Sequence, residues 1–229
     1  MCGRFTLTYP DHDLLAEELG VPVESLASYR PRFNIAPTDE HFILRIKTEA
    51  PELLPARWGL VNTWAKDRKD AAKRINARSE TVATTPAFRD AFEKRRCVVP
   101  SDGFYEWRRE GKERLPFRFH RADGRLLLMA GLYESWQPRP GEWERTFTIL
   151  TTAANDVVGQ LHDRMPVILD HAAAARWMFR TTPAEELAPL LVPAPPGALV
   201  MTAVSQRVNS VANDDPSVLD SPAVSPRLL

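Results

Sequence analysis

Cysteine is scarce in this sequence: Cys2 and Cys97 are the only two among 229 residues. Two cysteines are too few for the disulfide framework of a small secreted protein, so we expect a reducing, cytoplasmic setting. Long apolar runs are also missing, since none approaches the roughly 20 residues that a membrane-spanning helix needs. The first residues lack the charged and apolar regions of a signal peptide, and we therefore expect no membrane association.

The sequence has no excess of either charge, because 30 Lys and Arg balance 30 Asp and Glu. This balance excludes a polyanion binder held by bulk charge alone. Lysine is rare, however, and 24 of the 30 basic residues are arginine. Arginine suits bidentate phosphate contacts, although a GC-rich genome explains the same bias. The two cysteines and five scattered histidines lack metal-ligand spacing, and no Gly-rich phosphate loop appears, so we expect no metal and no cofactor.

Apolar periodicity favours strands, with a few helices between them. Helices are predicted over 11–19, starting near Ser79 within 79–95, over 171–179 and, more briefly, over 153–161. Strands are predicted over 42–46, 53–60, 97–107 with a kink at 100–102, 115–120, 126–133, 146–151, 165–169 and 198–202. Because strands and helices do not alternate regularly, the pattern indicates an α+β fold with a strongly bent, partly closed, mainly antiparallel, barrel-like sheet. We expect one domain over 1–215 and a loosely ordered tail over 216–229.

Cys2 is the most informative residue. An initiator Met is removed when the next side chain is small, and Cys2 would then carry both an α-amine and a thiol. The pKa of an α-amine is ~7.7–8.0, against ~10.4 for lysine, so a sizeable fraction is unprotonated at neutral pH. Such an aminothiol can attack an aldehyde with its nitrogen and close a thiazolidine ring with its sulfur. An incidental cysteine near the start of a chain explains the same residue.

Two titratable residues lie in contexts that suit proton transfer. Glu106 lies between two aromatic residues in a predicted strand, where burial raises a carboxyl pKa. A glutamate on the solvent face of the strand is the alternative. His162 precedes another strand and is the kind of side chain that moves protons near pH 7. A lone histidine is more often structural or merely exposed.

Two further segments point to nucleic acid. Ser79 can cap the predicted helix, and Asn76 and Arg78 would then lie at its positive end, where phosphate oxygens bind. Trp64 stands in a loop of charged residues and can stack on a base. A loop tryptophan that folds back onto the core is the competing interpretation.

In this order the motifs resemble the SOS-response-associated peptidase (SRAP) family, also described as abasic-site processing proteins. The matching stretches run over nearly the whole chain: 1–5 (MCGRF), 32–37 (RFNIAP), 58–60 (WGL), 75–81 (INARSET), 102–107 (DGFYEW), 161–166 (LHDRMP) and 204–213.

The resemblance implies an enzyme that recognises abasic sites in single-stranded DNA and forms a covalent thiazolidine cross-link, which shields the lesion during the DNA damage response. By this resemblance the α-amine of Cys2 attacks C1′ of the sugar. Glu106 carries protons, His162 assists ring opening and reversal, and Asn76 positions the amine or the sugar. Autoproteolytic removal of Met1 and weak abasic-site lyase activity are further implications. The protein is expected to act as a monomer and to be nucleoid-associated when bound to DNA.

The resemblance also implies the DNA contacts, which are Gly3, Arg4, Asn34, Trp64, Arg78, Thr151 and Arg164. One position departs from the family pattern: Pro86 stands where many members have a basic residue, and Arg89 is out of register. Two other functions stay open on the residues. The first is an N-terminal-nucleophile amidohydrolase that uses Cys2 on an amide, and the second is a non-enzymatic single-strand-binding module.

Overall fold

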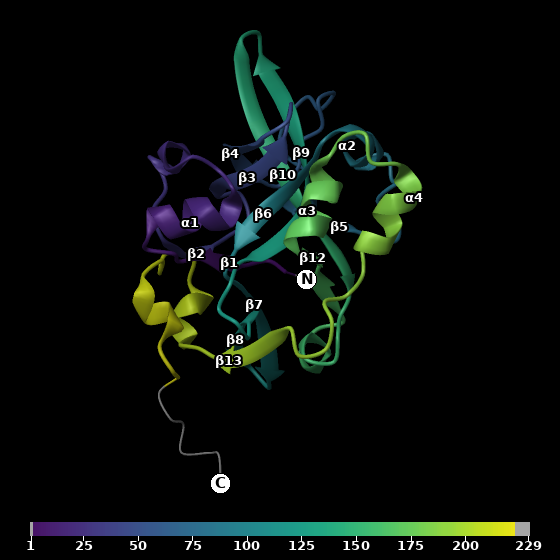
Figure 1. Cartoon of the computed structure of the whole chain (residues 1–229). Helices are drawn as coiled ribbons and strands as arrows, with labels where there is room; N and C mark the ends of the chain where they lie inside the picture. Colours follow the sequence, from purple (N-terminus) through teal and green to yellow (C-terminus); the bar gives the residue numbers. More distant parts are fainter. Residues whose placement is uncertain (1, 223–229) are drawn as a thin grey trace.

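The computed structural model describes residues 2–222, which form two β-sheets with helices around them (Figure 1). Five strands close into a barrel. They are β3 (Glu40–Ile46), β4 (Pro51–Trp58), β6 (Arg96–Ser101), β9 (Leu127–Arg139) and β10 (Glu142–Ala153). The hydrogen-bonded order is β10, β4, β3, β6 and β9, and β9 pairs with β10 again to complete the circuit. Among these five barrel pairs only β10–β4 is parallel, so the predicted α+β, barrel-like, mainly antiparallel fold is confirmed.

A second sheet lies below the barrel in Figure 1. Its order is β13 (Leu199–Ala203), β8 (Glu113–Arg121), β7 (Gly103–Glu110), β1 (Phe5–Leu7) and β2 (Arg32–Ile35). The chain passes straight from β6 in the barrel to β7 in this sheet, where the sequence predicted one kinked strand. Asp102 fixes the crossing, because its carboxylate accepts from the Thr8 backbone N–H at 2.7 Å and pairs with Arg118 at 3.0 Å.

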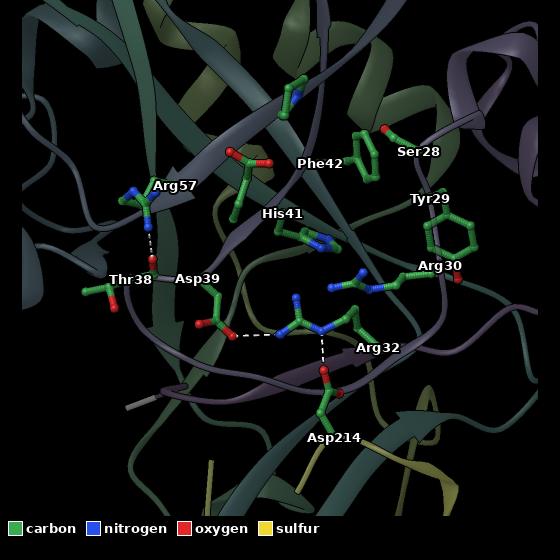
Figure 2. Close-up of a pocket in the computed structure, with 12 residues that line it drawn as sticks. Ser28, Tyr29, Arg30, Arg32, Thr38, Asp39, His41, Phe42, Arg57 and Asp214 are labelled. Carbon is green, nitrogen blue, oxygen red and sulfur yellow. Dashed lines mark hydrogen bonds and ion pairs between the residues drawn. The ribbon is translucent and has the colours of Figure 1, made fainter. Parts of the chain in front are cut away.

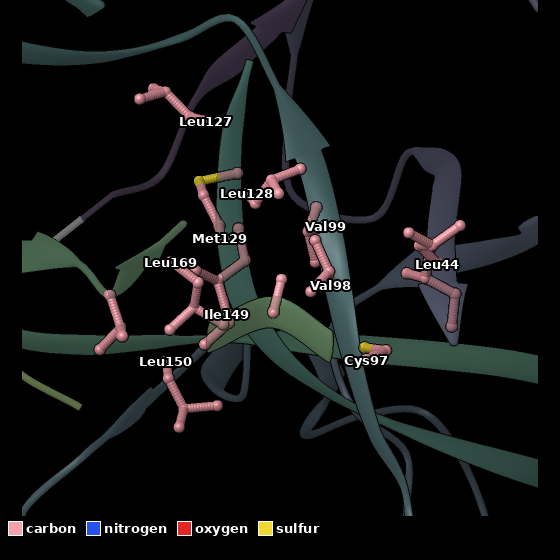
Figure 3. Close-up of a cluster of buried hydrophobic side chains, with 14 of the residues drawn as sticks. Leu44, Cys97, Val98, Val99, Leu127, Leu128, Met129, Ile149, Leu150 and Leu169 are labelled. Carbon is pink, nitrogen blue, oxygen red and sulfur yellow. The ribbon is translucent and has the colours of Figure 1, made fainter. Parts of the chain in front are cut away.

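The main core is formed by strands that are buried on both faces (Figure 3). Val98, Val99, Leu127 and Met129 have no exposed surface, and fully burying such a side chain contributes roughly 1.5–3 kcal/mol. Helix α3 (His171–Met178) covers β6 and β9, and Trp177 Nε1 donates to the Cys97 carbonyl at 2.9 Å. This cover explains why 126–133 reads as a continuous apolar run.

Three short strands extend the barrel sheet. β5 (Asn76–Arg78) and β11 (Arg164–Pro166) both pair with the end of β10, and β12 (Ile168–Leu169) pairs with β9. Strand β5 is parallel to β10, with Asn76 opposite Ile149 and Arg78 opposite Thr151.

The predicted helices are confirmed where neighbouring residues in the sequence fix the helix ends. Helix α1 (His12–Leu19) is capped by the Asp11 carboxylate and ends at Gly20, which has a φ of 64°. Helix α3 is confirmed over 171–178. The helix predicted over 79–95 is wrong for most of its length, because only α2 (Arg89–Lys94) is helical and 79–84 form turns. The remaining helices are α4 (Ala184–Leu187) and short 3-10 segments, which include Val158–Gln160 within the predicted helix 153–161.

No helix begins at Ser79, so Asn76 and Arg78 do not lie at a helix N-terminus as the sequence predicted. The Ser79 N–H donates to the Thr151 carbonyl at 2.9 Å and continues the β5–β10 pairing. Ser79 therefore caps no helix, and Asn76 and Arg78 belong to a strand. Any anion binding at this place depends on side chains and not on a helix dipole.

The chain stays ordered past residue 215, where we expected a loose tail to begin. Pro216–Leu219 form a 3-10 helix, and Val218 is fully buried against Tyr105, Val204 and Val208. The rest of the expected tail, 223–229, lies outside the described residues, as does Met1. None of the helices within 2–222 has the length and apolar character needed to cross a membrane.

Candidate active site

The Asn76 side chain is hydrogen-bonded to Cys2. Cys2 lies three residues before β1 begins at Phe5 and is fully buried. Asn76 opens β5, and its Nδ2 donates to the Cys2 carbonyl oxygen at 2.8 Å. The contact ties the segment that leads into β1 to the barrel sheet, in which β5 holds Asn76. Burial and, next, the Glu106 carboxylate raise the pKa of the Cys2 thiol, which is therefore a neutral thiol at pH 7.

Glu106 is buried within β7, with only 5% of its surface exposed. The solvent-face alternative considered from the sequence is thus wrong. Burial raises the pKa of the Glu106 carboxyl, and the nearby His162 opposes this shift. A carboxyl shifted in this direction is suited to taking up and releasing protons nearer neutral pH. The Glu106 carboxylate lies close enough to Cys2 to affect the pKa of its thiol. His162 in turn lies close enough to Glu106 to affect the carboxyl pKa, so the three groups share one site.

His162 follows the 3-10 segment Val158–Gln160. Its Nδ1 accepts from the Arg164 backbone N–H at 3.0 Å, so a neutral ring carries its proton on Nε2. The same Nδ1 lies 3.0 Å from an Asp163 carboxylate oxygen, which can pair with the ring once both nitrogens are protonated. The predicted residues Cys2, Asn76, Glu106 and His162 are therefore brought together by the fold.

The predicted DNA contacts Arg78, Thr151 and Arg164 meet at the end of β10. Arg78 is exposed and lies opposite Thr151. The Thr151 side chain is fully buried, and its backbone carbonyl accepts from Arg164 Nη2 at 2.6 Å. Thr151 therefore positions its neighbours and offers no side-chain surface to DNA.

Comparisons with known proteins identify the family. Residues 1–211 match the family model described as SOS response associated peptidase (SRAP). The chain belongs to the SRAP family. It is 38% identical to the abasic site processing protein YoaM of Bacillus subtilis, covering 96% of this chain and 98% of the relative. It is 36% identical to the abasic site processing protein YedK of Escherichia coli, covering 78% and 79%. A crystal structure of a Bacteroides thetaiotaomicron protein superposes with a TM-score of 0.84 at 26% identity, covering 96% and 99%.

Among the other predicted SRAP contacts, Trp64 is exposed. Its side chain is 65% exposed, and its ring lies under the Arg74 guanidinium at 5.9 Å. The alternative that it folds back onto the core is wrong. Gly3 is half-buried between Cys2 and Arg4.

Asn34 is buried, and Arg4 beside it is half-buried. Asn34 is 1% exposed, and its Nδ2 donates to the carbonyls of Val208, Ser210 and Asn213. Its Oδ1 accepts from Arg4 Nη1 at 2.7 Å. Burial lowers the pKa of the half-buried Arg4 guanidinium, which also lies 5.8 Å from the Trp107 ring centroid. Asn34 thus holds the segment 208–213 in place beside Arg4.

Sequence reasoning missed two acidic residues near these positions. Asp214 accepts from the backbone N–H groups of Phe33 and Asn34 at 2.6 and 2.8 Å. Glu80 pairs with Arg164 through both guanidinium Nη atoms. The only signal in the sequence was that each lies in or beside a stretch matching the family, namely 75–81 and 204–213.

A separate polar pocket of about 520 Å³ opens beside β2 and β3 (Figure 2). Arg32 pairs there with both Asp39 and Asp214, so its charge is neutralised within the protein. None of Cys2, Asn76, Glu106 or His162 lines this pocket, and it is not the site of their chemistry. Across residues 2–222, no group of three or more His, Cys, Asp or Glu can hold a metal ion.

Proposed function

We propose that this protein captures abasic sites in single-stranded DNA through Cys2, after removal of Met1, and holds the lesion as a thiazolidine that shields it from strand breakage. The main support is the convergence of the buried Cys2 with Asn76 and Glu106. The curated relatives named as abasic site processing proteins point to the same substrate.

The chemistry balances without an external oxidant or reductant. The open-chain sugar of an abasic site has an aldehyde at C1′. The Cys2 α-amine adds to that carbon, and the adduct loses one water to form an imine. The thiol sulfur then adds to the imine carbon while its proton passes to the nitrogen, which closes the ring. Proximity supplies much of the rate because both nucleophilic atoms belong to one residue.

The surrounding side chains have distinct roles in this proposal. Glu106 carries protons to and from the amine and imine, and His162 assists sugar ring opening and reversal. Asn76 holds the Cys2 backbone and thereby directs the amine. Because burial raises the pKa of the Cys2 thiol, a thiolate is disfavoured as the first nucleophile. This direction favours the amine as the group that attacks first.

The proposed DNA path uses few specific contacts. Trp64 stacks on a base beside the lesion, while Arg78 and Arg164 approach the backbone. The protein acts as a monomer that associates with the nucleoid through DNA. Autoproteolytic release of Met1 and weak β-elimination from the imine are parts of the same proposal.

The decisive experiment uses a single-stranded oligonucleotide with one abasic site and a denaturing gel. The wild-type protein should give a heat-stable shifted band whose mass equals that of the Met1-free protein plus DNA minus one water. Cys2→Ala should give none, whereas the matched control Cys97→Ala, which removes the other buried thiol, should retain it.

Other outcomes identify the alternatives. Ammonia release from glutamine that depends on Cys2 would indicate an amidohydrolase. Wild-type protein without a covalent band, together with binding of undamaged strands that Cys2→Ala leaves intact, would indicate a binding module.

A further inference from the structure

Arg164 is already paired within the free protein. Its Nη1 and Nη2 donate to the two Glu80 carboxylate oxygens at 2.6 and 2.8 Å. The Arg164 side chain is only 14% exposed, whereas that of Glu80 is 50% exposed. A fork of this kind is the geometry with which arginine binds either a carboxylate or a phosphate.

Arg78, the second arginine at this place, also acts on Glu80. Its carboxyl pKa is lowered chiefly by the hydrogen bonds from Arg164, and the Arg78 charge adds to the effect. The carboxylate is therefore influenced by both arginines that the proposed function directs toward the DNA backbone. No phosphate can take both Nη atoms of Arg164 while Glu80 occupies them.

The two partners differ in how firmly they are held. Arg164 lies in β11 and also donates to the Thr151 carbonyl at 2.6 Å, which anchors its guanidinium independently of Glu80. Glu80 lies in a turn outside every helix and strand. Glu80 can therefore swing into solvent while Arg164 stays in place.

We propose that Glu80 is an internal substitute for a DNA phosphate, which occupies Arg164 in the free protein and is displaced when a strand binds. The inference rests on the proposed function in that Arg164 faces the DNA backbone. Binding exchanges one ion pair for another, so this position adds little net affinity. Glu80 thereby keeps the binding of intact strands weak and leaves retention to covalent capture.

Fluorescence anisotropy tests this inference with a labelled single strand that carries tetrahydrofuran, a non-reactive abasic analogue. Glu80→Gln should bind roughly threefold to tenfold more tightly, as expected for one freed charged contact. The slope of log K against log salt should steepen by about 0.7, the value for one more phosphate contact on a single strand. Adding Arg164→Gln to Glu80→Gln should abolish the gain.

Glu52→Gln is the matched control. Glu52 is 43% exposed and pairs with Arg45, which is 12% exposed, so the variant removes the same charge from a similar pair on the β3–β4 hairpin. It should change neither the affinity nor the salt slope. If Glu80→Gln lowers the melting temperature, Glu80→Asp, which cannot span both Nη atoms as well, should show a smaller gain in the same direction.

Equal or weaker binding by Glu80→Gln with an unchanged salt slope would overturn the inference and make Glu80 an orienting partner of Arg164. The wild-type cross-linking assay is read separately. A gain in affinity by Glu80→Gln without any wild-type cross-link would contradict covalent capture and leave this inference standing.

Discussion

Asn76 donates a 2.8 Å hydrogen bond from its side-chain amide to the carbonyl of Cys2, which lies 74 residues earlier in the chain. Strand β5 fixes Asn76 through its parallel pairing with β10, and β1 fixes the chain after Cys2 through its pairing with β7. The start of the chain is therefore held by two sheets. A nucleophile placed in this way loses little entropy when it reacts.

Asn76→Ala should slow covalent capture by about 10- to 100-fold, because small displacements of reacting groups have effects of this size. Affinity for undamaged single strands should stay unchanged, since Asn76 contacts Cys2 and not the proposed DNA path. The measurement is a single-turnover time course on denaturing gels, with anisotropy for affinity.

Asn62→Ala is the control for Asn76→Ala. Asn62 is a buried residue whose side-chain amide also donates to a backbone carbonyl, that of Ala87, at 2.8 Å. Its loss should leave the capture rate of the folded protein intact. If Asn76→Ala captures the lesion at the wild-type rate, Asn76 has no part in the reaction.

Glu106→Gln should slow capture by roughly 10²–10⁴-fold, the usual contribution of a general acid or base. The same substitution should stabilise the folded protein relative to wild type at neutral pH. Because burial raises the Glu106 pKa, the folded state binds the proton more tightly than the unfolded state. The stability that this provides is complete below about pH 4.3, the ordinary glutamate pKa, and is lost as the pH rises through the folded-state pKa.

Urea denaturation at several pH values checks this sign. The free energy of unfolding of Glu106→Gln, relative to wild type, should increase as the pH rises from 4 to 7. A relative stability that falls over the same range would show that the ionised carboxylate is stabilised in the folded protein.

Local signals explain what the sequence predicted of the fold. Helix α1 is set by its own Asp11 cap and by Gly20, and both are visible in the sequence. The helix expected from Ser79 failed because the Ser79 N–H bonds to the Thr151 carbonyl. That partner is distant in sequence, so no local pattern announces it.

In the candidate site, too, some features could be predicted from the sequence and others depend on tertiary packing. Cys2, Glu106 and His162 could be selected by chemistry and by motif, and the fold brings them together. The burial of Asn34 and Thr151 could not be predicted, because it depends on tertiary packing: Asn34 bonds to the carbonyl of Val208, 174 residues away. A motif identifies a residue as important without stating whether it touches the substrate or supports a neighbour.

Trp64→Ala should weaken binding to single-stranded DNA by about 1–3 kcal/mol, the loss expected for one stacked base. The melting temperature should stay the same, since the side chain is 65% exposed. Anisotropy and thermal denaturation measure the two quantities.

Trp143→Ala provides a matched comparison for Trp64→Ala, because Trp143 is 67% exposed on the β9–β10 hairpin. It should bind DNA as the wild type does. Equal losses in the two variants would indicate non-specific aromatic binding and no defined stacking position.

Asn34→Ala should lower the free energy of unfolding and have only a small effect on DNA affinity. The substitution removes the donor to three backbone carbonyls and the acceptor for Arg4. Each buried group left unpaired lowers the free energy of unfolding by about 1–3 kcal/mol, which urea denaturation measures directly. Affinity for single strands, recorded where both proteins are fully folded, should fall less than for Trp64→Ala. A loss of affinity larger than that of Trp64→Ala, at unchanged stability, would contradict this supporting role and point to a direct DNA contact.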